Sequence, residues 1–136
     1  MFTSMSENTK KIMNEGVSLG EKGDFLGAIK YFKKILENDK NHLYAWMFAA
    51  KSWESLGRGN SNAAQEAIHY YDEVIRIDKS NPEGWFGKGV VLVSYLNKPD
   101  ESFDCFTKTL ELGENHVLAL MNKGIILDDA NQPEMQ

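Results

Sequence analysis

The sequence predicts an all-α protein made of repeated pairs of antiparallel helices, and three observations support this class. Apolar residues recur three and four positions apart along successive segments, which is the spacing of one face of an α-helix. A pattern of apolar and small residues occurs four times, with its small residue at Gly16, Ala50, Gly89 and Gly124. The chain of 136 residues has room for four such units, which are 34 to 39 residues apart. One repeating unit therefore accounts for nearly the whole chain.

Periodicity and boundary residues together place about seven helices in chain order. Their expected bounds are about 7–22, 25–38, 42–57, 62–78, 82–96, 99–112 and 115–130. Consecutive helices should pair as hairpins, which gives repeats at about 9–42, 43–81 and 82–116 and a partial repeat at 117–130. We expect a single domain over residues 1–136, with flexible ends at 1–6 and 131–136.

Four of these helices begin at residues that favour a helix start. Asp24 is expected to cap the second helix, because its side chain can accept a hydrogen bond from a first-turn N–H. Asn62 is expected to cap the fourth, with Gln65 three residues later as its capping-box partner. Asn81-Pro82 and Lys98-Pro99 place proline in the first turn of the fifth and sixth helices, where no N–H is needed.

Small residues recur where the two helices of a hairpin should approach each other. A glycine inside a helix costs roughly 1 kcal/mol relative to alanine, so its repeated use on the first helices indicates close packing. The matching small residues on the second helices are Ala28, Ala67 and Ser102.

The spacing of the small residues also locates two insertions. Five extra residues lie between Ala50 and Ala67, and one lies between Gly89 and Ser102. We expect both insertions in the hairpin turns, where helical repeats tolerate them. The run 57–60 is Gly-Arg-Gly-Asn, which lacks the Gly-Lys-Ser/Thr ending and the preceding strand of a phosphate-binding loop. We therefore interpret it as a lengthened turn.

The repeated pattern resembles the tetratricopeptide repeat, whose consensus is W-x₂-L-G-x₂-Y, then A-x₃-F, then P. The second repeat reads Trp46-x-x-x-Ala50-x-x-Trp53 and then Ala67-x-x-x-Tyr71, and the third follows the same spacing from Trp85. The resemblance covers about residues 9 to 130. The departures are at the final Pro, here Lys40, Lys79 and Glu114, and at the Leu, here Glu15, Ala49, Lys88 and Lys123. The resemblance implies a right-handed superhelical solenoid whose first helices line a concave face.

Composition argues against several classes of partner. Fifteen Lys and Arg residues against twenty Asp and Glu residues give a net charge of −5, which suits neither nucleic acid nor an anionic membrane. The related pentatricopeptide repeats bind RNA, but that function needs a basic face. The start of the chain does not resemble a signal peptide, and no apolar run approaches membrane-spanning length. We expect a soluble, cytoplasmic protein.

The polar residues give no sign of catalysis, a cofactor or a metal site. His42 and His116 precede the first helices of two repeats, so we expect surface or capping histidines set at least one repeat apart. Cys105, the single cysteine, is expected to be half-buried and unreactive. Asp100-Glu101 and Asp128-Asp129 are helix neighbours that point about 100° apart, so neither pair should share a metal ion. We expect that the protein is not an enzyme.

The resemblance implies that the second, fifth, ninth and twelfth positions of each repeat face the concave side. The residues there that we expect to bind a partner are Met13, Val17, Tyr44, Met47, Lys51, Phe86, Val90, Met121 and Ile125. A known subclass clamps the acidic tails of heat-shock chaperones with Lys, Asn and Arg. The matching positions here hold Met13, Val17, Phe48, Glu83 and Gly87, so this mechanism is rejected. The expected function is a non-catalytic scaffold or adaptor whose groove binds a peptide or an amphipathic helix.

The last helix suggests an alternative function. Apolar residues surround much of it, whereas a solenoid normally ends in a helix with a polar outer face. These residues are Leu118, Leu120, Met121, Ile125, Ile126 and Leu127. The chain could be a fragment of a longer array, the helix could pair with a second copy to form a homodimer, or the third repeat could cap it. A homo-oligomeric self-assembly module is therefore the alternative to the adaptor.

Overall fold

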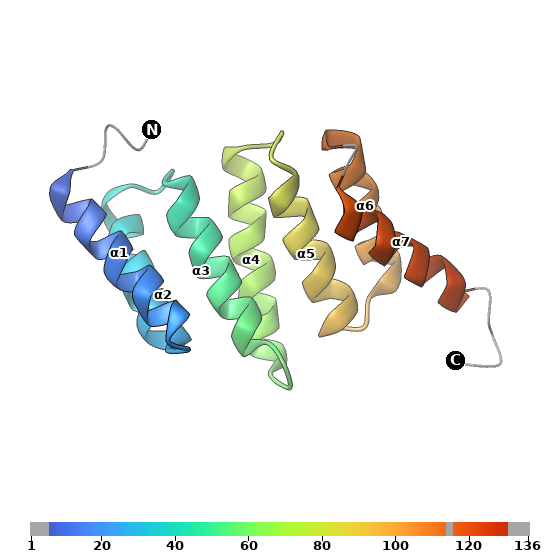
Figure 1. Ribbon diagram of the computed structural model, residues 1–136, viewed down its shortest axis with the longest axis horizontal. Helices are drawn as coiled ribbons and strands as arrows, with labels where there is room; N and C mark the ends of the chain where they lie inside the picture. Colours follow the sequence, from blue (N-terminus) through green and yellow to red (C-terminus); the bar gives the residue numbers. More distant parts are fainter. Residues whose placement is uncertain (1–5, 114–115, 131–136) are drawn as a thin grey trace.

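The computed structural model describes residues 6–113 and 116–130, and this part of the chain forms helices and turns with no strand (Figure 1). The helices are α1 (Glu7–Glu21), α2 (Phe25–Asn38), α3 (Leu43–Leu56), α4 (Ser61–Ile77), α5 (Pro82–Ser94), α6 (Pro99–Leu112) and α7 (Val117–Ala130). Figure 1 shows them side by side in chain order. Each helix packs on its neighbours in sequence, and α3 also contacts α1 and α5. The all-α solenoid predicted from the repeats is confirmed.

The predicted helices are confirmed, with each end within two residues of its expected position. Residues 1–5 and 131–136, where we expect flexible ends, lie outside the described residues. Ser6, which we placed in the N-terminal end, instead caps α1: its hydroxyl accepts a hydrogen bond from the Thr9 N–H at 3.1 Å.

The predicted helix starts are correct at three positions and wrong at one. Asp24 caps α2 by accepting a bond from the Gly27 N–H at 2.9 Å, and Pro82 and Pro99 open α5 and α6. The N-cap of α4 is Asn60 rather than Asn62, and its side chain accepts from the Ala63 N–H at 3.1 Å.

Most of the second repeat's extra residues are helical, which corrects the expectation that they lengthen the turn. Helix α4 begins six residues before Ala67, whereas α2 begins only three residues before Ala28. The turn at 57–60 is one residue longer than the turn at 22–24. An added helical turn keeps its backbone hydrogen bonds satisfied, which a longer loop would not do by itself. The single extra residue of the third repeat does lie in its turn, at 95–98.

The small residues of α1 and α5 lie against aromatic rings of the helix that follows. A β-carbon built on Gly16 would come within 2.6 Å of Phe32, and one on Gly89 within 2.7 Å of Phe106. Ala50 is fully buried at the same position of the second repeat. The close packing predicted from these residues is therefore confirmed for the three complete hairpins.

Candidate partner-binding groove

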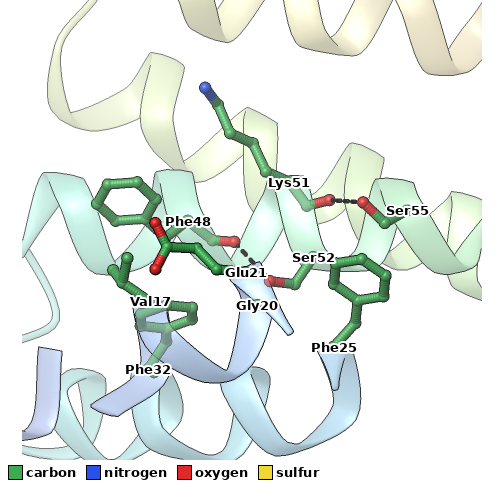
Figure 2. Close-up of a pocket in the computed structure, with 10 residues that line it drawn as sticks. Val17, Gly20, Glu21, Phe25, Phe32, Phe48, Lys51, Ser52 and Ser55 are labelled. Atoms are coloured by element: carbon green, nitrogen blue, oxygen red, sulfur yellow. Dashed lines mark hydrogen bonds between the residues drawn. The ribbon is translucent and has the colours of Figure 1, made fainter. Parts of the chain in front are cut away.

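Two adjacent hollows lie along the face formed by α1, α3 and α5. The first, which we call the apolar pocket, has a volume of about 300 Å³ and lies between α1, α2 and α3 (Figure 2). Its lining residues are Gly16, Val17, Gly20, Glu21, Phe25, Phe32, Phe48, Lys51, Ser52 and Ser55. Figure 2 shows the three phenylalanine rings around the hollow and the Lys51 side chain extending away from them.

The walls of the apolar pocket offer few free hydrogen-bonding groups. The Ser52 hydroxyl donates to the Phe48 carbonyl at 3.0 Å, and the Ser55 hydroxyl donates to the Lys51 carbonyl at 3.0 Å. Phe32 and Phe48 stack with their ring centres 5.9 Å apart, which fixes one wall. A β-carbon on Gly20 would meet only Ala28, at 3.9 Å, so this glycine leaves space above α2. The pocket is suited to an apolar side chain.

The second hollow, the mixed pocket, has a volume of about 270 Å³ and lies where α3, α4 and α5 meet. Its lining residues are Lys51, Glu54, Ser55, Tyr71, Glu83, Phe86, Gly87 and Val90. The Tyr71 hydroxyl donates to a carboxylate oxygen of Glu54 at 2.5 Å. A β-carbon on Gly87 would overlap the Tyr71 ring, so the tyrosine reaches the pocket only because residue 87 is a glycine.

Glu54 is a carboxylate partly removed from water. Burial raises its pKa above the ordinary glutamate value, while the Tyr71 hydrogen bond and the charge of Lys51 oppose part of this rise. Burial likewise raises the pKa of Tyr71, and the Glu54 carboxylate raises it further, so the tyrosine remains a donor. The hydrogen bond from Tyr71 holds the Glu54 side chain in the lining of the mixed pocket.

The two predicted capping histidines are confirmed as helix caps. Nδ1 of His42 accepts from the Ala45 N–H, and Nδ1 of His116 accepts from the Ala119 N–H, each at 3.2 Å. Nε2 of His116 also lies 2.9 Å from a carboxylate oxygen of Glu83. A neutral ring with its proton on Nε2 satisfies both contacts of His116. This contact holds the Glu83 side chain at the edge of the mixed pocket.

The residues expected to bind a partner occupy five different environments. Val17 and Lys51 line the apolar pocket, and Lys51, Phe86 and Val90 line the mixed pocket. Tyr44 and Met47 lie on α3 outside both linings, with the Tyr44 ring 6.5 Å from that of Phe48. Met121 and Ile125 are exposed on α7, again outside both pockets. Met13 is only 7% exposed and belongs to the core, so it offers no groove surface.

The position rule looks only at the first helix of each repeat, so it misses the aromatic residues that the second helices contribute. Phe25 and Phe32 of α2 line the apolar pocket, and Tyr71 of α4 lines the mixed pocket. The sequence signal that could have found two of them is a glycine on the facing helix, Gly16 opposite Phe32 and Gly87 opposite Tyr71.

The described residues contain no group of three or more His, Cys, Asp or Glu side chains that could hold a metal ion. Asp100 and Glu101 lie in the first turn of α6, where negative charge complements the helix dipole. Cys105 is buried, which raises the pKa of its thiol to about 11. Near neutral pH this thiol is protonated and is therefore a poor nucleophile.

Comparison with known proteins supports the fold of nearly the whole chain and identifies one repeat by its sequence. Residues 12–42 match the tetratricopeptide repeat family. The structure is similar to that of the Yersinia enterocolitica type III secretion chaperone SycD in complex with a peptide of the translocator YopD. Their TM-score is 0.83 at 15% identity, over 93% of this chain and 97% of the other. It is also similar to the first TPR of Spaghetti (RPAP3) bound to the HSP90 peptide SRMEEVD, with a TM-score of 0.82 at 16% identity, over 93% and 96% of the two chains.

The fold is the tetratricopeptide repeat solenoid. In sequence, the chain is 25% identical over 117 residues to the Arabidopsis thaliana protein described as a probable UDP-N-acetylglucosamine–peptide N-acetylglucosaminyltransferase, SPINDLY. The match covers 85% of this chain but only 12% of that protein. Among the residues that the structure describes, no helix has the length and apolarity needed to cross a membrane.

Proposed function

We propose that this chain is a non-catalytic interaction scaffold that binds a peptide or an amphipathic helix in the groove made by α1, α3 and α5. The observation that carries the proposal is the pair of adjacent pockets, whose linings combine phenylalanine rings with a few charged groups. Concave sites with apolar walls and a small number of polar groups are the usual form of a binding site. An adaptor role in the cytoplasm is part of this proposal.

Two similar structures support a peptide ligand, because SycD and the first TPR of Spaghetti are each described in complex with a peptide. The HSP90 peptide of the second ends in acidic residues. In this chain the pockets present Glu21, Glu54 and Glu83, so an acidic ligand would meet like charge. We therefore propose that this chain, like the similar structures, binds a peptide, but that its ligand in the groove is not an acidic peptide.

The test is selection of peptides from a phage-displayed library of random twelve-residue sequences, followed by fluorescence anisotropy with the selected peptides. Val17→Glu and Phe86→Ala should each weaken binding at least about tenfold, because the first places a charge in the apolar pocket and the second removes an aromatic ring from the mixed pocket. Leu26→Glu is the matched control, because Leu26 is exposed on α2 outside both pockets. Circular dichroism checks that all three variants keep their helicity. Full binding by both groove variants would overturn the proposal.

A second candidate function, self-assembly through α7, is favoured by one specific observation. Apart from its chain neighbours and the nearby backbone of α7, no described residue has an atom within 4 Å of the position that a β-carbon on Gly124 would take, whereas the equivalent Gly16 and Gly89 lie against phenylalanine rings. The neighbouring side chains that are large, apolar and exposed are Val117, Leu118, Leu120, Met121, Ile125 and Leu127. A patch of this kind usually marks an interface.

Light scattering over a concentration series separates the two candidates. A constant mass near 15.4 kDa would exclude self-assembly. A mass twice as large that returns to the monomer value in Ile125→Glu would establish it, because Ile125 is 55% exposed on α7. The groove proposal survives either result, provided that the peptides selected above still bind.

A further inference from the structure

The two pockets are close enough to bind one short segment. Lys51 and Ser55 line both of them, so the pockets share a wall formed by a single turn of α3. The Lys51 side chain is exposed at this wall and extends away from the apolar pocket (Figure 2). A ligand that fills one pocket therefore reaches the other within a few residues.

The apolar pocket selects for size and apolarity. Its volume of about 300 Å³ is at the lower end of the roughly 300–1,000 Å³ of small-molecule sites, which suits one or two side chains. Its serine hydroxyls are already bonded to backbone carbonyls of α3. A polar side chain entering there would lose its bonds to water without replacing them, whereas an aliphatic or aromatic one would not.

The mixed pocket selects for positive charge. Glu54 and Glu83 each accept one hydrogen bond from a neighbouring side chain, Tyr71 and His116 respectively. A carboxylate has about four acceptor sites, so each can accept further bonds from a ligand. Burial of Glu54 also makes its negative charge costly, and a cation placed beside it would offset that cost. Phe86 adds an aromatic ring to the same lining.

The charge around the two pockets points in the same direction. Among the described residues that line them, Glu21, Glu54 and Glu83 are acidic and Lys51 is basic. The lining therefore carries net negative charge, in line with the −5 of the whole chain. Complementary charge determines which partners are selected more than it determines total affinity.

We propose that the groove recognises peptide segments in which an apolar side chain lies within a few residues of a lysine or arginine. The apolar side chain occupies the apolar pocket, and the basic side chain reaches Glu54 and Glu83 in the mixed pocket. This inference rests on the proposed function, since it names the chemistry of the ligand for the same groove.

The experiment uses the full chain and the library-selected peptides described above. The selected sequences should be enriched in an apolar residue with a basic residue nearby. Replacing that basic residue by alanine should weaken binding to the native chain about tenfold, which is the effect of losing one favourable charge pair. The same replacement should change binding to Glu54→Gln or Glu83→Gln by about twofold or less, because the charge partner is already absent.

Controls separate folding from recognition. Glutamine keeps an oxygen that can accept from Tyr71 or His116, so both variants should retain the native melting temperature. Glu66→Gln is the matched control, because Glu66 is an exposed glutamate of α4 outside both pockets, and it should behave like the native chain.

The outcomes distinguish two failures. Peptides that lose binding to Val17→Glu but carry no basic residue would overturn this inference and leave the proposed groove intact. The same holds if their basic residue has an equal effect on the native chain and on both glutamine variants. Peptides that bind Val17→Glu and Phe86→Ala as well as they bind the native chain would overturn the proposed function and this inference together.

Discussion

Gly89 in α5 and Gly124 in α7 occupy the same position of the repeat, but their surroundings differ. The Gly89 backbone lies against the Phe106 ring of α6, whereas the corresponding side of Gly124 is open. Gly84, Gly87, Gly89, Val91 and Leu92 are buried in α5, while Ala119 and Ile126 are the residues buried in α7 among those described. The small residue of the repeat therefore has its packing role only where a second helix supplies a ring to cover it.

The first helix of a repeat cannot bury its own apolar side chains and needs a second helix to cover them. Helix α7 is as rich in apolar residues as α5, yet six of its large apolar side chains are exposed because it packs on α6 from one side. If α7 remains uncovered in solution, substitutions in α7 and in the covered helix α5 should have different effects on stability.

The largest expected effect is that of removing the ring that covers Gly89. Phe106 is fully buried, so Phe106→Ala should lower the free energy of unfolding by about 3–5 kcal/mol. Leu120→Ala should lower it by less than about 0.5 kcal/mol, since Leu120 is exposed on α7. Urea denaturation measures both. Similar losses for the two variants would show that α7 is covered in solution, and the comparison would fail.

Replacing Gly89 or Gly124 by alanine should change the free energy of unfolding in opposite directions. Gly89→Ala forces a β-carbon against Phe106 and should destabilise the protein by about 1–3 kcal/mol. Gly124→Ala meets no neighbour and removes a flexible residue from a helix, so it should stabilise by about 0.5–1 kcal/mol. Thermal denaturation of the two single variants gives the signs directly. Destabilisation by Gly124→Ala would indicate a helix packed on that face.

A smaller effect is expected at the hydrogen bond that joins α6 to α5. The Ser102 hydroxyl is buried and donates to the Gly89 carbonyl at 2.7 Å. Ser102→Ala should cost about 1 kcal/mol, which corresponds to a fall of about 3–6 °C in melting temperature. Ser94→Ala, at an exposed position near the end of α5, is the control and should leave the melting temperature unchanged. Equal melting temperatures for Ser102→Ala and the native chain would mean that the bond adds nothing.

The smallest effect on stability near neutral pH is that of the protonation of Cys105, a buried residue of α6. Burial is the main cause of the raised pKa of this thiol; the positive charge of Lys88 on α5 opposes part of the rise, and the negative charge of Asp72 on α4 adds to it. The folded chain keeps the thiol proton up to about pH 11, whereas the unfolded chain loses it near pH 9. The contribution of the thiol to the free energy of unfolding is therefore full below pH 9 and is lost as the pH rises toward 11. At pH 8 the folded thiol should react with iodoacetamide at least about 100-fold more slowly than the unfolded one. Rapid labelling of the folded chain would show that α6 separates from α5.

The helices could be predicted from the sequence because the periodic apolar positions and the prolines at helix starts act locally. The N-cap of α4 could not, because two asparagines lie within three residues of each other. Gly59 decides between them: its φ of +70° turns the chain so that Asn60, in extended backbone, reaches the first-turn N–H. The sequence shows the glycine but not the backbone angle that it adopts.

The groove was only partly predictable, for a different reason. A position rule can select Val17, Lys51 and Phe86 on the first helices, because their spacing fixes which way they face. The rule cannot show that Met13 is enclosed in the core or that Tyr71 passes Gly87 to reach Glu54. Those features depend on the distance between two packed helices, and the pattern of residues within one helix does not determine that distance.

Every substantial helix–helix contact in the described part of the chain joins elements that are adjacent or next-but-one in sequence. A local opening can therefore travel only step by step along the row of helices. Amide hydrogen exchange should be fastest in α7, slower in α6 and α5, and nearly independent of these events in α1 and α2. The protein can thus loosen at one end while the apolar pocket between α1, α2 and α3 keeps its shape. The mixed pocket is linked to that end, because His116 caps α7 and its ring lies against Glu83 and Phe86 of α5.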